Sequence, residues 1–123
     1  MLLDSNSIIY SIKKEFPKLR QLVAEHSPAV SAISYIEVLG YHQLAESDKQ
    51  DFIEFFKTAR LIYISQAIVE QAVELRQKRK ISLGDSIIAA TAIVNDLTLI
   101  TANIADFKWI SNIKLLNPLT EDS

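Results

Sequence analysis

Four carboxylic acids in the 123-residue chain lie where the sequence pattern ends a strand or begins a helix. Asp4 closes a short apolar run at the start of the chain, and Glu37 lies in the first turn of the helix expected after the second such run. Asp85 begins an apolar helical segment, and Asp106 follows the fourth apolar run. In an open parallel sheet, functional groups collect beyond the carboxyl ends of the strands. We therefore expect the four acids to converge on one rim.

A cluster of this kind favours metal-assisted chemistry. Carboxylates a few ångströms apart repel one another and raise one another's pKa, and a divalent cation relieves that repulsion. A site with oxygen ligands alone suits Mg²⁺, with Mn²⁺ as the other candidate. Magnesium keeps several waters and often completes its shell with phosphate, so the acids predict phosphodiester hydrolysis. Attack by an activated water would leave 5′-phosphate and 3′-hydroxyl ends.

Each acid also has an explanation without chemistry. Asp4 could cap the helix after it, and Glu37 is at the N3 position of a capping box that begins at Ser34. Asp85 could be a helix cap or first-turn acid favoured by the helix dipole, and Asp106 could lie in a surface loop. The shared placement of the four residues, not any one of them, favours the metal site.

The elements that must position these acids alternate between strands and helices. Strands are expected at residues 1–4, 29–32, 61–64, 97–101 and 113–116. Helices are expected at residues 7–14, 17–26, 34–44, 47–59, 66–80 and 85–95, with a turn or short helix at 104–109. Short, continuous apolar strands indicate a parallel sheet covered on both faces. The prediction is a three-layer α/β/α domain over residues 1–118, with a mostly parallel five-stranded sheet and a loose tail at 119–123.

Composition excludes several other kinds of site. The chain is 49% hydrophobic and 23% charged, which is typical of one globular domain. Two glycines cannot build a phosphate loop or a Rossmann fingerprint, and without cysteine there is no disulfide, thiolate nucleophile or cysteine-bearing zinc site. No stretch resembles a signal peptide or a membrane span, so we expect a cytoplasmic protein with no membrane partner.

The net charge of −2 argues against binding through a broad basic surface. Without the four acids of the expected site, however, 13 basic residues stand against 11 acidic ones. A basic segment before Asp85 could contact a nucleic-acid backbone; it consists of Arg76, Lys78, Arg79 and Lys80. The alternative is that these side chains only complement the end of a helix dipole.

Four segments of the chain together resemble the motifs of PIN-domain ribonucleases, and most closely those of VapC-type toxins from toxin–antitoxin pairs. The segments are residues 2–6, 33–39, 83–92 and 99–107. The resemblance extends from Met1 to about Pro118. It implies an endoribonuclease that depends on Mg²⁺ or Mn²⁺, is inhibited by a cognate antitoxin protein and usually forms a homodimer.

The resemblance also assigns roles to individual residues. It implies that Asp4, Glu37, Asp85 and Asp106 are the metal-binding and catalytic acids. It further implies that Asn6, Thr101 and Asn103 line the site. One departure is Ala102, because many relatives carry arginine at this position. The resemblance therefore does not supply that cationic contact to phosphate.

Two alternatives to a toxin stay open at this stage, a non-catalytic PIN-like module that binds protein and an RNA-processing nuclease outside any toxin–antitoxin pair. The presence of all four acids argues against the first. Gly84 is expected to act through its flexibility, by setting how the helix that carries Asp85 begins.

Overall fold

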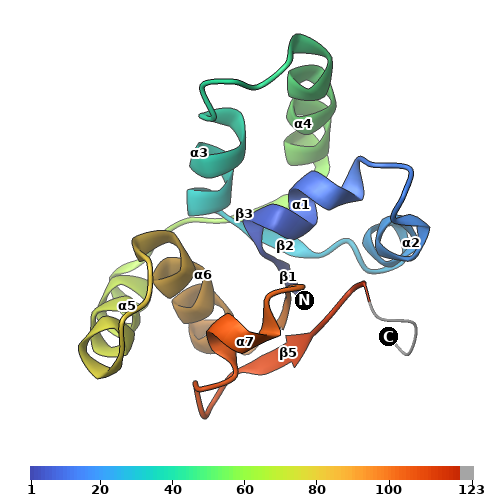
Figure 1. The fold of residues 1–123 in the computed structure, drawn as a ribbon. Coiled ribbons are helices and arrows are strands. Elements are labelled where there is room, and N and C mark those ends of the chain that lie inside the picture. The colour runs from blue at the N-terminus through green and yellow to red at the C-terminus, as the bar shows by residue number, and fades with distance from the viewer. Residues whose placement is uncertain (120–123) are drawn as a thin grey trace.

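A five-stranded sheet forms the centre of the protein, and the computed structural model describes it together with all other elements of residues 1–119 (Figure 1). All four strand pairs are parallel, in the order β3-β2-β1-β4-β5. The strands are β1 (Leu2–Leu3), β2 (Ala29–Ser31), β3 (Arg60–Ile62), β4 (Thr98–Ile100) and β5 (Lys114–Leu116). The helices are α1 (Ser5–Ser11), α2 (Pro17–His26), α3 (Ala32–Leu39), α4 (Glu46–Thr58), α5 (Gln66–Lys78), α6 (Leu83–Val94) and α7 (Ile104–Phe107). The predicted α/β class is confirmed, and the sheet is parallel throughout.

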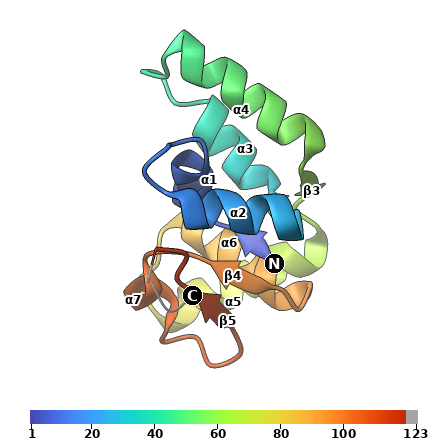
Figure 2. The same ribbon diagram turned by 90° about the vertical axis from the view of Figure 1, so that its right-hand side faces the viewer.

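Helices cover both faces of the sheet, because adjacent residues of a strand point to opposite sides. Leu2 packs with buried residues of α5, α6 and α7, whereas Leu3 packs with buried residues of α1 to α4. Leu99 and Ile100 divide in the same way on β4. Figures 1 and 2 show the resulting layers, with α1 to α4 on one side of the sheet and α5 to α7 on the other.

The strand order reverses beside β1. The chain runs from β1 outward through β2 to β3, and then returns to the other side of β1 for β4 and β5. The amide of Asp4 donates to the Ile100 carbonyl at 3.1 Å, so the ends of β1 and β4 stay joined at this point. In open α/β sheets, ligands bind beyond the strand ends where the order reverses.

Serine caps set where the helices on this edge begin, and they correct two predicted boundaries. The Ser31 hydroxyl accepts from the amide of Ile33 at 3.2 Å, so α3 begins directly after β2 and the expected start at Ser34 is wrong. The Ser82 hydroxyl accepts from the amide of Asp85 at 3.1 Å, so α6 begins at Leu83. Asp85 is therefore a first-turn residue and not the cap.

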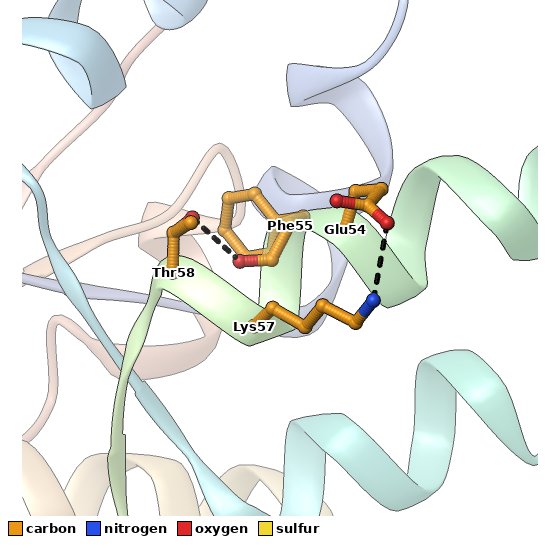
Figure 3. Close-up of polar contacts among 4 residues, drawn as sticks. All are labelled: Glu54, Phe55, Lys57 and Thr58. Atoms are coloured by element: carbon orange, nitrogen blue, oxygen red, sulfur yellow. Dashed lines mark hydrogen bonds and ion pairs between the residues drawn. The ribbon is translucent and has the colours of Figure 1, made fainter.

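The end of α4 shows how the scaffold away from this edge is held (Figure 3). The Lys57 ammonium lies 3.3 Å from a carboxylate oxygen of Glu54, and the Thr58 hydroxyl donates to the Phe55 carbonyl at 3.2 Å. Both charged side chains are mostly exposed, and such pairs, three residues apart, stabilise a helix by only about 0.2–0.5 kcal/mol. These contacts support the turn from α4 into β3.

Within residues 1–119, no helix is long and apolar enough to cross a membrane. Of the predicted tail at 119–123, Leu119 is an exposed turn residue, and residues 120–123 lie outside the described residues.

Candidate active site

Asp4 is the buried acid of the site. It follows β1 directly, and the residue is only 5% exposed. Its Oδ1 accepts from the amide of Ser7 at 2.8 Å, so Asp4 also caps α1. The structural and the chemical interpretations of this residue are compatible, because the cap uses one carboxylate oxygen.

Glu37 reaches the same edge from the second turn of α3, not from the first turn as expected. Its Oε1 lies 2.7 Å from the Ser5 hydroxyl, which in turn lies 2.9 Å from the hydroxyl of Ser34. A carboxylate only accepts and a hydroxyl has one proton, so Ser5 donates to Glu37 and accepts from Ser34. This chain orients an exposed carboxylate across two helices.

Gly84 lies against the other side of the Glu37 carboxylate. A Cβ atom at position 84 would lie 2.7 Å from Oε2 and 3.2 Å from Cδ of Glu37. The glycine is the second residue of α6, and its φ is not positive. The predicted role in backbone flexibility is therefore wrong: the glycine provides space for the carboxylate.

Asp85 is the acid most affected by the others. Burial raises the pKa of its carboxyl above the ordinary value, and a hydrogen bond with the Ser82 side chain partly opposes that rise. The negative charges of Asp106, Glu37 and Asp4, in that order, raise the pKa further. Each of the other three predicted acids thus acts on Asp85, which places all four in one electrostatic environment.

Asp106 lies in α7 and shares a cleft with Asp85. The cleft has a volume of about 330 Å³ and is also lined by Arg79, Lys80 and Trp109. Asp106 is exposed, and among the neighbouring charges its effect on Asp85 is the largest. These two acids therefore face solvent-accessible space in which a ligand could be held.

The three predicted polar residues have different positions. Thr101 is fully buried, and its hydroxyl accepts from the amide of Asn103 at 3.0 Å, so it shapes the turn from β4 into α7. Asn103 is exposed at the start of α7, and Asn6 is exposed in the first turn of α1. Of these three side chains, only that of Thr101 forms a hydrogen bond within residues 1–119.

The basic segment is divided by the end of α5. Arg79 and Lys80 follow the helix and line the cleft with the acids. Lys78 lines a separate cleft and lies 3.8 Å from Glu74, while Arg76 is exposed and lines neither cleft. Half of the predicted contact segment thus lies beside the site.

The donor set fits a hard cation in chemistry, since it consists of carboxylates and hydroxyls. Within residues 1–119, no three acidic or histidine side chains are close enough to form one metal-binding group. Magnesium is usually bound through one or two carboxylates and several waters, so it does not require such a group. The pKa of Asp85 is raised first by burial and then by the negative charges of Asp106, Glu37 and Asp4, and a cation would relieve that mutual repulsion.

Sequence reasoning missed the Ser5 donor and the Ser82 cap, and it assigned Trp109 to packing of the last strand, with stacking on RNA as the alternative, without placing it in the cleft with the acids. The spacing of Ser82 and Asp85 is that of a helix cap followed by a third-position acid, and it could have located the start of α6. Ser5 follows Asp4 directly and Trp109 lies three residues after Asp106, but their contacts with Glu37 and Arg79 join segments distant in sequence, which no local spacing reveals.

Together, the all-parallel sheet and the acids around its switch point define an α/β protein with an acidic site at the carboxyl edge of the sheet. The family model of the PIN domain matches residues 1–110. The chain belongs to the PIN-domain family, as the motifs predicted.

Several known proteins are similar to this chain over nearly its whole length. Ribonuclease VapC2 of Rickettsia felis is 30% identical over 128 residues, covering 94% of this chain and 96% of that protein. Ribonuclease VapC10 of Mycobacterium tuberculosis is 28% identical over 122 residues, covering 93% and 90%. A chain of a toxin–antitoxin complex from Klebsiella pneumoniae is 34% identical with a TM-score of 0.73, covering 95% of this chain and 96% of that one. A chain of VapBC2 from Rickettsia felis, bound to a promoter DNA fragment, is 27% identical with a TM-score of 0.81, covering 94% and 96%.

Proposed function

We propose that this protein is a Mg²⁺-dependent endoribonuclease and the toxin of a toxin–antitoxin pair. The observation that carries the proposal is that Asp85 and Asp106 line one cleft at the strand-order switch point, with Glu37 against the helix that carries Asp85 and Asp4 at the end of β1. Burial, and after it the negative charges of Asp106, Glu37 and Asp4, raises the pKa of the Asp85 carboxyl. The names of the relatives, ribonucleases of the VapC type, support RNA as the substrate.

Asp85 and Asp4 are the residues that would hold the ion, with Glu37 and Asp106 completing the acidic edge directly or through water. When bound, Mg²⁺ stabilises charge on the phosphate and lowers the pKa of a water. Ser5 keeps the Glu37 carboxylate turned toward α6, and Asp4 is held in place by its own cap of α1. Because water and not the ribose hydroxyl attacks, the products are 5′-phosphate and 3′-hydroxyl ends.

An RNA cleavage assay tests this function. Purified wild type should cut RNA with Mg²⁺ or Mn²⁺, and both EDTA and Asp85→Asn should stop it. Activity that is equal in EDTA or in the variant would contradict the mechanism and indicate a contaminating nuclease. No cleavage with any metal tested would contradict the assignment as an enzyme.

An antitoxin is the partner that the toxin assignment requires, and the structure offers a surface for it. A groove of about 430 Å³ runs between α1, α3 and α4, and its lining includes Ile12, Val38, Leu44 and also Glu37. A chain segment bound in this groove would contact the Glu37 carboxylate and obstruct the site. The occurrence of similar chains in a toxin–antitoxin complex and in VapBC2 supports an antitoxin as the partner, and the groove is our proposal for where it docks.

A homodimer is also part of the proposal, because the resemblance implies one. Large hydrophobic side chains are exposed outside the acidic edge, among them Ile36 of α3, Tyr63 after β3 and Val73 of α5. Light scattering on the purified chain should give twice the mass of 13.9 kDa. A monomer at all concentrations would contradict this point alone. The cytoplasmic location stays a prediction from the sequence, which cell fractionation would test.

A further inference from the structure

The cleft beside Asp85 and Asp106 combines opposite charges on its two walls. The acids come from α6 and α7, and the cations Arg79 and Lys80 come from the connection between α5 and α6. Neither cation forms an ion pair within residues 1–119, although carboxylates line the same cleft. Two unneutralised cations beside an acidic site match a ligand that needs both a metal site and positive charge, which is the chemistry of a phosphodiester.

Arg79 is held in a defined place by Trp109. Its backbone is extended where α5 ends, so the side chain leaves the helix at this residue. The guanidinium carbon lies 5.6 Å from the centroid of the Trp109 ring, within range of a cation–π contact. The guanidinium keeps its hydrogen-bond donors at the edge of its plane when it stacks on a ring, so it still offers them to a phosphate.

Trp109 is itself fixed relative to the acids. Its indole Nε1 donates to the backbone carbonyl of Asp106 at 2.9 Å, and its ring packs against the core on the α5–α7 face of the sheet. The Trp109 ring therefore fixes the position of Arg79 relative to the segment that carries Asp106. An ordinary solvent-exposed arginine has no such constraint.

We propose that Arg79, held by the Trp109 ring, and Lys80 bind a backbone phosphate of the RNA in this cleft, beside the bond that is cut. The proposal rests on the ribonuclease function above and adds a substrate subsite to it. A volume of about 330 Å³ is at the small end of ligand pockets and fits one nucleotide of a single strand. Arg79 and Lys80 contact the substrate, and Trp109 is a positioning residue.

The binding test uses a fluorescein-labelled short oligouridylate in EDTA, so that no cleavage occurs. Anisotropy should show that Arg79→Gln and Lys80→Gln each weaken binding about tenfold and reduce the slope of log affinity against log salt by about 1. The matched control is Lys57→Gln on α4, which removes an equal charge from a side chain already paired with Glu54 (Figure 3). The control should bind within about twofold of wild type.

Trp109 is the single tryptophan of the chain, so its fluorescence reports on the cleft directly. Oligouridylate should change the tryptophan emission of wild type in a saturable way, and Arg79→Gln should need about tenfold more oligouridylate for the same change. In cleavage assays, Trp109→Leu should raise KM with little effect on kcat, and Trp109→Phe should restore KM because it keeps an aromatic face. A purely structural role for Trp109 would instead lower the melting temperature of both variants and leave KM unchanged.

The two proposals fail in different ways. If wild type cuts RNA but Arg79→Gln and Lys80→Gln bind oligouridylate as wild type does, the subsite is wrong and the ribonuclease function stands. Equal losses in Lys57→Gln would also overturn the subsite, because they would show a general effect of charge. If wild type binds oligouridylate through Arg79 and Lys80 but cuts no RNA with any metal, the subsite stands as a binding site and the ribonuclease function is wrong.

Discussion

Replacement of Gly84 by alanine should damage the site without damaging the fold. The new Cβ would lie 2.7 Å from Oε2 of Glu37, so that oxygen would have to move by about 0.7 Å to reach an ordinary contact of 3.4 Å. The obstructing group is the end of a flexible side chain, which turns away at little cost in stability. Alanine also favours a helix interior over glycine by up to about 1 kcal/mol, and the φ of Gly84 suits it.

The expected result is a fall in kcat of about 10- to 100-fold, since misplacement by about 1 Å can cost a hundredfold. The melting temperature should be unchanged or higher. RNA cleavage rates and thermal denaturation on the same samples measure both quantities.

A double-mutant cycle decides whether this effect acts through Glu37. In a Glu37→Ala background there is no carboxylate to displace, so Gly84→Ala should cause no further loss. An equal fall in both backgrounds would refute the reasoning, and so would full activity of Gly84→Ala in the wild-type background.

Three further predictions concern charge and partner binding. Asp85→Asn should raise the melting temperature at neutral pH. Burial and the neighbouring acids raise the folded-state pKa of Asp85, so the contribution of this group to wild-type stability falls as pH rises from the ordinary value of 3.8 through the folded pKa. Urea denaturation of both proteins across this range should show the variant gaining stability relative to wild type as pH rises, and a constant difference would contradict the assignment. Asp4→Asn should lose activity but keep its cap of α1, whereas Asp4→Ala should also lose about 1 kcal/mol of unfolding free energy; equal stability of the two variants would contradict the cap. Tyr41→Glu, in the apolar groove, should weaken inhibition by a co-expressed antitoxin and leave RNA cleavage intact, and undiminished inhibition would exclude this groove as the docking surface.

The sequence predicted the layers of the fold because they depend on local signals. Continuous apolar strands alternated with helices, and pairs such as Leu2 and Leu3 divided between the two faces as a buried parallel strand requires. The predicted helix boundaries were less accurate where two serines were candidate caps. The cap of α3 is Ser31 and not Ser34, because Ser31 ends β2 in an extended conformation and its hydroxyl reaches the amide of Ile33.

The candidate acids could be chosen from the sequence, but their geometry could not. Strand ends predict which carboxylates share an edge, and the effects of three acids on Asp85 agree with that expectation. The close approach of Gly84 to Glu37 depends on how α3 and α6 pack, which no spacing within either helix reveals. The same is true of Trp109, whose contact with Arg79 joins segments on either side of α6.

The end groups of the cleaved RNA test the central claim most directly, which is that a metal-activated water at the acidic edge attacks the phosphodiester. Wild type with Mg²⁺ should produce 5′-phosphate and 3′-hydroxyl ends, and the same products should be absent with EDTA and in Asp85→Asn. Products with 2′,3′-cyclic phosphate ends, formed equally in EDTA, would show attack by the ribose hydroxyl and contradict the account.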